Sequence, residues 1–282
     1  MGNMDRDIRT NETLDAYRDY LQMEEKSQYT VEKYLRDART FMDYAEGRAI
    51  TKELAIDYKN ELIAKGYAVS SVNSMLASLR SLLHFLGLDG CRVRSLKTQR
   101  QVFCPEEKEL TREEYFRLLA AAEGQPRLQL ILETVCATGI RISELKYFTV
   151  EAAKEGEVRV SCKNKIRTVL LPKKLRRKLL SYAADTGVKA GVLFCTRSGK
   201  ALDRSNIWTA MKKLCEKAGV LPSKVFPHNL RKLFARCFYE IKKDIAKLAD
   251  ILGHSSVNTT RIYLMSSGGE HRRCIERLNL LI

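Results

Sequence analysis

The sequence predicts a mainly α protein with one small β-sheet (the α+β class), divided between two domains. The chain has 282 residues, and a typical domain size of about 150 residues makes two the expected number of domains. Apolar side chains recur at helical spacing along most of the chain, whereas residues 157–172 alternate like a β-hairpin. We therefore expect a helical domain at 1–88, a basic linker at 89–108 and a second domain at 109–282.

The first domain is predicted to be a bundle of about four helices. Its apolar stripes run through residues 14–21, 31–45, 51–64 and 71–86. Stripes of this kind are the faces that helices bury against one another. The domain therefore needs no strand to form a core.

The second domain is predicted to mix helices with short strands. Thr111 and Glu114 form a capping-box pattern that starts its first helix. A β-hairpin at 157–172 and a short strand at 191–195 are expected next. Further helices are expected at 207–218, 228–242 and 246–252.

The basic excess is confined to one part of the chain. Residues 1–108 hold 17 basic and 17 acidic side chains, whereas residues 109–282 hold 33 and 17, which accounts for the whole net charge of +16. From Lys163 to Lys178, eight of sixteen residues are basic and none is acidic. An excess of this size points to a polyanionic partner such as nucleic acid.

Composition excludes several protein classes. With 45% hydrophobic and 30% charged residues, the chain is globular rather than disordered or fibrous. No apolar run reaches the ~20 residues of a membrane span, and the N-terminus has no secretory signal, so we expect a cytoplasmic protein without a membrane partner. The eight cysteines lie 13 or more residues apart, so they form no metal or redox motif. We expect reduced thiols and no cofactor or metal.

Two arginines, two histidines and a tyrosine are the residues that point to a catalytic site. Arg141 follows a glycine turn in ATGIRISEL and is expected just inside a new helix, and HNLRKLFA places His228 and Arg231 on one helix face. His254 and Tyr263 belong to ILGHSSVNTTRIYL. Each residue alone has an ordinary explanation, such as a surface ion pair or a helix cap. Together, beside a basic hairpin, they suit nucleophilic attack on a phosphodiester.

This reaction explains why these residue types occur together. Negative charge grows on the non-bridging oxygens in the transition state, and guanidinium groups bind such oxygens without losing a proton. Imidazoles add a hydrogen bond or handle the proton of the nucleophile near neutral pH. A tyrosine hydroxyl can form a covalent phosphotyrosine, and a lysine on the hairpin can protonate the leaving sugar oxygen.

With these motifs the chain resembles the tyrosine recombinases, also called the phage integrase family, in a compact Xer-type layout. ATGIRISEL resembles the first arginine box of the family, HNLRKLFA its His-x-x-Arg box, and ILGHSSVNTTRIYL its Leu-Gly-His box with the tyrosine. The first domain is similar to the family's SAM-like core-binding domain, and we expect no added arm-site domain before it. The resemblance implies a catalytic domain at 109–282 whose apolar C-terminal tail docks on a neighbouring protomer.

The resemblance also implies roles for individual residues. Glu144 is expected to hold the Arg141 side chain in place without contacting the DNA itself. The hairpin is one residue shorter than the family pattern, so Lys165 competes with Lys163 as the general acid. The implied catalytic residues are Arg141, Lys163, His228, Arg231, His254 and the nucleophile Tyr263. Further DNA contacts are expected from Lys165, Arg167, Lys232, Arg92 and Arg94.

The implied function is site-specific recombination of double-stranded DNA at inverted-repeat core sites. Strands would be cleaved through a 3′-phosphotyrosine and exchanged through a Holliday junction, without metal or ATP. A monomer or dimer would bind each site before a homotetramer assembles on two sites, and the enzyme is expected on the bacterial nucleoid. The sequence leaves open integration or excision, inversion and dimer resolution. Two alternatives also remain: DNA relaxation of the type IB topoisomerase kind, and DNA binding without catalysis.

Overall fold

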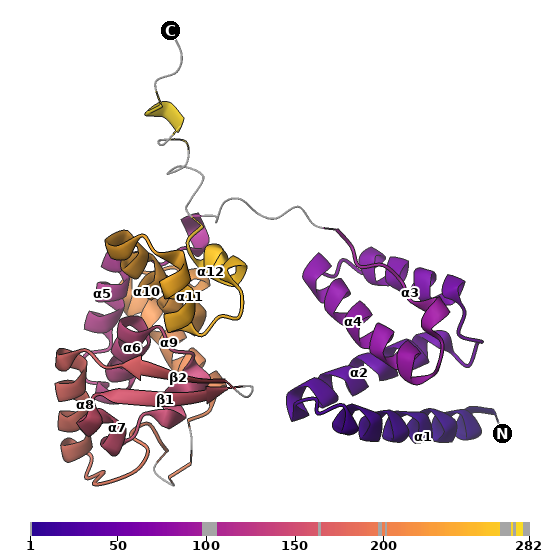
Figure 1. The fold of residues 1–282 in the computed structure, drawn as a ribbon, viewed down its shortest axis with the longest axis horizontal. Coiled ribbons are helices and arrows are strands. Elements are labelled where there is room, and N and C mark those ends of the chain that lie inside the picture. The colour runs from indigo at the N-terminus through magenta and orange to yellow at the C-terminus, as the bar shows by residue number, and fades with distance from the viewer. Residues whose placement is uncertain are drawn as a thin grey trace. The chain divides into compact units, whose positions relative to one another are not determined.

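The chain folds into two compact units, Met1–Arg100 and Gln101–Ile282 (Figure 1). The computed structural model describes residues 2–97, 106–162, 165–196, 199–200, 202–265, 272 and 275–278. Helices dominate both units, and one two-stranded sheet accompanies them, which confirms the predicted fold class. None of the helices among the described residues meets the length and hydrophobicity that a membrane span requires.

The first unit is a bundle of four helices. They are α1 (Gly2–Met23), α2 (Gln28–Ala45), α3 (Lys52–Ala64) and α4 (Val69–Phe85). Side-chain caps fix two of the helix starts: the Ser27 hydroxyl accepts from the Thr30 amide at 3.3 Å, and the Thr51 hydroxyl accepts from the Leu54 amide at 3.2 Å. The predicted stripes face inward and form one core.

The first unit also includes residues that were expected to be linker. A short 3₁₀ helix, η1 (Asp89–Cys91), follows α4, and Val93 is only 4% exposed in the bundle core. The Asn73 side chain donates to the Leu96 carbonyl at 3.0 Å and accepts from the Leu96 amide at 2.7 Å. Residues 89–96 thus pack against the helical bundle and hydrogen-bond to it.

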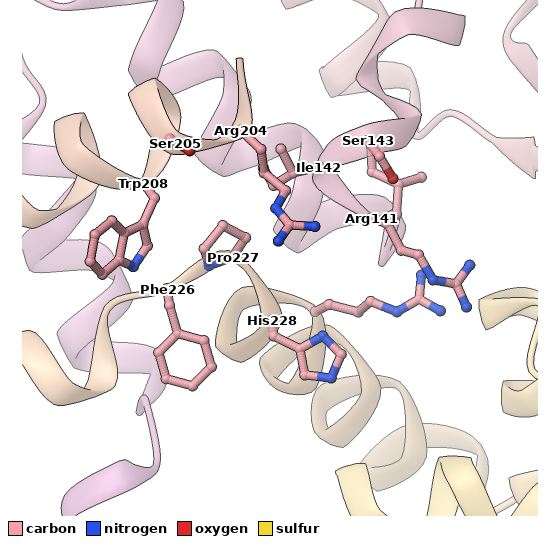
Figure 2. Close-up of a pocket in the computed structure, with 11 residues that line it drawn as sticks. Arg141, Ile142, Ser143, Arg204, Ser205, Trp208, Phe226, Pro227 and His228 are labelled. Atoms are coloured by element: carbon pink, nitrogen blue, oxygen red, sulfur yellow. The ribbon is translucent and has the colours of Figure 1, made fainter. Parts of the chain in front are cut away.

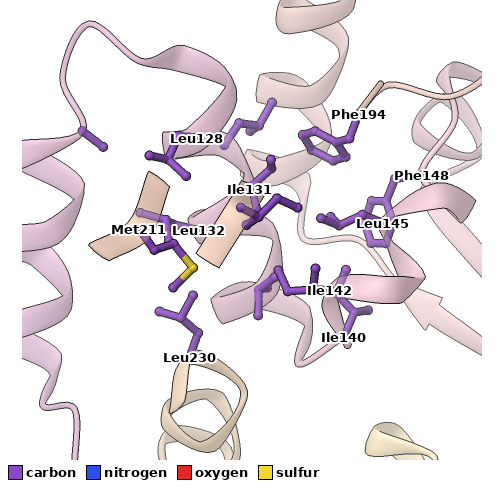
Figure 3. Packing of buried hydrophobic residues seen from close by; sticks show 14 of the residues in the cluster. Leu128, Ile131, Leu132, Ile140, Ile142, Leu145, Phe148, Phe194, Met211 and Leu230 are labelled. Atoms are coloured by element: carbon purple, nitrogen blue, oxygen red, sulfur yellow. The ribbon is translucent and has the colours of Figure 1, made fainter. Parts of the chain in front are cut away.

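The second unit is built around one helix that is buried on most of its faces. This helix is α6 (Pro126–Thr138), and α5, α8, α9 and α10 pack around it. Figure 3 shows the apolar side chains of this core. The other elements are η2 (Glu106–Lys108), α5 (Arg112–Ala121), η3 (Ile142–Tyr147), α7 (Val150–Glu155), α8 (Lys173–Asp185), α9 (Arg204–Ala218), η4 (Pro222–Lys224), α10 (Pro227–Lys242), α11 (Ile245–Leu252) and α12 (Val257–Tyr263).

The predicted hairpin is present as the antiparallel pair β1 (Glu157–Cys162) and β2 (Lys165–Leu170). Val158 and Val160 of β1 and Val169 of β2 face the core. The strand predicted at 191–195 is wrong: Val192 makes only an isolated bridge to Thr149. The apolar residues of this segment pack in the hydrophobic core instead of pairing with a neighbouring strand. Leu193 and Phe194 are each 1% exposed.

Gly139 forms the tightest junction of the second unit. It ends α6 with a φ of +64°, a conformation that favours glycine. A Cβ atom there would lie 2.4 Å from the Phe234 ring of α10 and 2.9 Å from a methyl group of Leu252 of α11. Three helices therefore meet where only a glycine fits.

We expect Gly139→Ala to destabilise the second unit more than Gly219→Ala does. Both glycines end a helix at positive φ, so each substitution carries a conformational cost of about 1–2 kcal/mol. Nothing lies within 4 Å of a Cβ at Gly219, whereas overlap at Gly139 adds about 1–3 kcal/mol. Denaturant unfolding followed by the fluorescence of Trp208, the one tryptophan, measures the difference, and equal losses would contradict it.

Candidate active site

The sequence motifs converge at one place in the second unit. Arg141 immediately precedes η3, and α10 carries His228 and Arg231. His254 follows the end of α11, and Tyr263 is the last residue of α12. The expectation that Arg141 lies inside a helix is wrong, since it caps a 3₁₀ helix from an extended conformation.

Arg231 is the buried centre of the site, with 1% of its surface exposed. Its guanidinium donates to the carbonyl of Gly139, at the end of α6, and to that of Leu252, at the end of α11, the latter at 2.5 Å. Carbonyls at helix ends lack helical partners and carry partial negative charge, so they stabilise a buried cation. Burial, followed by the charge of Arg141, lowers the pKa of Arg231 to about 10. Arg231 therefore stays protonated at neutral pH.

His254 connects Arg231 to α12. Its Nε2 lies 3.1 Å from the Arg231 guanidinium, and its Nδ1 lies 2.8 Å from the hydroxyl of the buried Thr260. Because arginine only donates, Nε2 accepts; the hydrogen-bond partners thus assign the proton to Nδ1, which donates to Thr260. Burial first, and then the charges of Arg231 and Arg141, lower the pKa of His254 to about 4. The imidazole is therefore neutral at pH 7.

Tyr263 lies between the two histidines. Its ring centroid is 4.9 Å from those of His228 and His254, with interplanar angles of 82° and 89°. The Arg231 guanidinium carbon lies 5.9 Å from the same ring. Only 5% of Tyr263 is exposed. Edge-to-face contacts and a nearby cation stabilise an aromatic ring in a fixed position, so the tyrosine is positioned within its own unit.

Glu144 holds Arg141 by two hydrogen bonds. Its carboxylate accepts from the Arg141 amide at 2.7 Å and from the Arg141 guanidinium at 3.0 Å, and only 3% of its side chain is exposed. Burial alone would raise the pKa of Glu144, but hydrogen bonds from Arg167 and Arg141 outweigh it and hold the pKa below its ordinary value. The buried carboxylate therefore remains charged.

A pocket of about 500 Å³ has Arg231 in its lining. Arg141 and His228 line one part of it, and Arg204 and Trp208, from the first turns of α9, line another (Figure 2). The His228 imidazole lies against Tyr263, and its partial burial, followed by the charges of Lys232 and Arg231, lowers its pKa. The pocket is thus lined by arginine side chains and by the neutral imidazole of His228.

The remaining predicted residues lie in different surroundings. Lys163 lies outside the described residues, and for Lys165 only the backbone is described, at the start of β2. Lys232 follows Arg231 on α10 and is half-buried. Arg92 and Arg94 are exposed in the first unit, where Arg92 pairs with Asp89. Within the described ranges, no group of three His, Cys, Asp or Glu is placed to hold a metal ion.

Arg167, expected to contact DNA, points into the unit instead. Both of its terminal amino groups donate to the Glu144 carboxylate, at 2.9 and 2.7 Å. Only 14% of its side chain is exposed. In this arrangement its guanidinium is committed to a protein carboxylate rather than held out to solvent.

Two supporting residues were not predicted from the sequence. Thr260 accepts the hydrogen bond from Nδ1 of His254 and so orients the imidazole. The Asn229 amide donates to the Lys108 carbonyl at 2.7 Å and to the Lys224 carbonyl at 2.8 Å, which holds the start of α10 against two neighbouring segments. The position of Asn229 between His228 and Arg231 was the available signal, but its partners are not readable from sequence.

Family comparison covers both units. The phage integrase family matches residues 108–269, and the N-terminal SAM-like domain of phage integrases matches residues 14–90. Tyrosine recombinase XerA of Pyrococcus furiosus is 30% identical over 281 residues, covering 96% of this chain and 95% of the relative.

Solved structures show the same fold. A crystal structure of XerA recombinase is 27% identical with a TM-score of 0.54, covering 97% of this chain and 100% of the other. A lambda integrase tetramer bound to a Holliday junction is 18% identical with a TM-score of 0.70, covering 90% and 76%. The second likeness concerns the fold alone.

We expect His254 to titrate near pH 4 as an Nδ1–H tautomer, which ¹⁵N NMR of the imidazole measures. Arg141→Gln should raise this pKa, because it removes one of the charges that lower it. Since the folded-state pKa lies below the ordinary 6.5, the unfolded chain binds this proton first. The contribution of His254 to the free energy of unfolding should therefore be lost as the pH falls from 6.5 to about 4. Titration near 6.5, or an Nε2–H tautomer, would contradict the assignment.

Proposed function

The chain belongs to the phage integrase family of tyrosine recombinases, and on this premise we propose that it is a site-specific DNA recombinase whose nucleophile is Tyr263. The observation that supports this best is the position of the Tyr263 ring, 4.9 Å from each of two imidazoles and 5.9 Å from a buried guanidinium. A tyrosine with only a packing role needs no such polar surroundings.

In the proposed cleavage step the Tyr263 hydroxyl oxygen attacks the scissile phosphorus. His228 takes the phenolic proton, since its pKa lies below the ordinary value and no described residue hydrogen-bonds to its imidazole. His254 has both nitrogens engaged, by Arg231 and Thr260, so we assign it an orienting role. Arg141 and Arg231 neutralise the charge that develops on the non-bridging oxygens.

The leaving group is the 5′-oxygen of the DNA strand, which receives a proton from a lysine of the β1–β2 hairpin. Lys163 and Lys165 both remain candidates for this role. The products are a 3′-phosphotyrosine and a free 5′-hydroxyl. The phosphotyrosine linkage conserves the energy of the cleaved phosphodiester bond, because the bond is not hydrolysed. Attack by the 5′-hydroxyl of a partner strand on the same phosphorus releases Tyr263 and completes the exchange.

We further propose that the first unit binds duplex DNA beside the cleavage site and that four protomers act on two sites. The match of residues 14–90 to the SAM-like domain supports the first point. The lambda integrase tetramer on a Holliday junction, which shares this fold, is consistent with the second. Action in the cytoplasm, on the nucleoid, remains a prediction.

Covalent capture tests the nucleophile. The protein is incubated with a pool of duplexes of randomised sequence, each nicked so that the short strand carrying the new 5′-hydroxyl diffuses away. We expect a protein–DNA adduct that survives denaturant, because the missing strand prevents religation. Tyr263→Phe should abolish the adduct, since it removes the attacking oxygen.

Tyr239→Phe is the matched control, because Tyr239 packs in the same small cluster as Tyr263. It should retain the adduct. No wild-type adduct on any duplex of the pool, or an adduct that persists in Tyr263→Phe, would overturn the proposal. Relaxation of supercoiled plasmid without recombinant product would instead favour the topoisomerase alternative.

We also propose that the C-terminal tail docks on a neighbouring protomer. Ile275 and Leu278 lie one helical turn apart and are 56% and 60% exposed, which leaves apolar surface available to a partner. Deletion of residues 270–282 should abolish recombination between two captured sites while single-site adducts still form.

A double substitution of Ile275 and Leu278 by Asp should act like the deletion. Ile241→Asp, at a residue of α10 that is 77% exposed, should leave recombination unchanged. Full recombination by the deletion variant would disprove tail docking without affecting the assignment of Tyr263.

A further inference from the structure

Arg167 is an inward-facing cation in the middle of β2. Its Cα partner across the hairpin is Val160, which is 1% exposed, and its neighbour on the same face of β2 is Val169, at 5%. Alternation along a strand places these residues on one side. Burying an arginine there is costly unless the charge is paired, so its partners indicate its role.

The partner of Arg167 is the carboxylate that also holds Arg141. The two guanidinium–carboxylate bonds, at 2.9 and 2.7 Å, are bidentate, which is the strongest geometry for this pair. Glu144 thus accepts four hydrogen bonds, two from Arg167 and two from Arg141. The carboxylate is shared between a mostly buried arginine, Arg167, and a half-exposed one, Arg141.

This sharing has an electrostatic consequence for Arg141. A carboxylate paired with Arg141 alone would cancel the charge that a phosphate must meet. With Arg167 added, the three side chains carry two positive charges and one negative, so the cluster keeps a net charge of +1. The side chain of Arg141 is 36% exposed and that of Arg167 is 14% exposed, so the half-exposed guanidinium is the one that can reach a ligand.

Arg167 also packs against the segment that carries His254. A Cβ atom at Gly253 would lie 2.8 Å from Cδ of Arg167 and 3.1 Å from one of its terminal nitrogens. Gly253 ends α11 with a φ of +64°. One side chain therefore touches the hairpin, the Glu144 carboxylate and the turn into His254.

We propose that Arg167 is a positioning residue: by holding Glu144, it orients Arg141 for the scissile phosphate, while its packing against Gly253 keeps its own side chain in place. This inference rests on the proposed function and replaces the expectation of a direct DNA contact. Arg167 acts through Arg141, so its contribution to cleavage requires an intact Arg141.

Substitution of Arg167 by Gln tests the role, with Arg159→Gln as the matched control. Arg159 lies on the other strand of the same hairpin, and its side chain is 77% exposed. On a nicked duplex captured by the wild type, Arg167→Gln should slow single-turnover cleavage on the order of 10²-fold, the effect of a small misplacement of a reacting group. Duplex affinity and its salt dependence should change no more than in Arg159→Gln, and Arg167→Lys should recover part of the rate.

A double-mutant cycle separates positioning from contact. In an Arg141→Lys background, Arg167→Gln should add little further loss, because the group it positions is already altered. Multiplicative losses in the double variant would overturn the proposal. So would a fall in affinity accompanied by a salt slope lower by about one, the signature of a phosphate contact.

A measurement without DNA keeps this inference separate from the proposed function. In Arg167→Gln, Glu144 stays buried but loses two charge-assisted hydrogen bonds, so its pKa should rise, as read by ¹³C NMR of the carboxyl. Arg159→Gln should leave it unchanged, and thermal unfolding establishes that both variants are folded. An unchanged Glu144 pKa in folded Arg167→Gln would disprove the positioning role even if Tyr263 forms adducts, and absent adducts would leave this test intact.

Discussion

The buried guanidinium of Arg231 is the interaction on which the second unit depends. It ties together two chain segments, because it donates to carbonyls at the ends of α6 and α11. Those carbonyls would otherwise be buried without partners, at a cost of about 1–3 kcal/mol each. The same guanidinium hydrogen-bonds His254 and lies beside the Tyr263 ring. The charge that stabilises the fold is therefore also the charge at the centre of the site.

The site resolves a conflict between packing and chemistry. Phosphate recognition needs several cations close together, yet cations repel one another when water is excluded. Helix-end carbonyls compensate Arg231, and one carboxylate is divided between Arg141 and Arg167. Two neutral imidazoles fill the space around Tyr263 without adding charge. The cations are thus stabilised by partners that leave an excess of positive charge.

Local patterns explain which features were predictable from the sequence. The helices follow from apolar stripes, and the short motifs placed Arg141, His228 and Tyr263 because their spacing is local. The strand expected at 191–195 was wrong, since apolar residues such as Phe194 are equally suited to a core without a ladder. Arg167 lies on the same face of β2 as the buried Val169, but the run of basic residues at 163–178 favoured a DNA contact in the sequence prediction.

Long-range partners account for what the sequence could not provide. The Gly139 carbonyl lies 92 residues from Arg231, and Glu144 lies 23 residues from Arg167. Among the described residues, the contacts that build the site fall within Gln101–Ile282. The geometry around Tyr263 is therefore assembled from residues of a single unit, so long-range contacts within that unit, and not the local motifs, decide it.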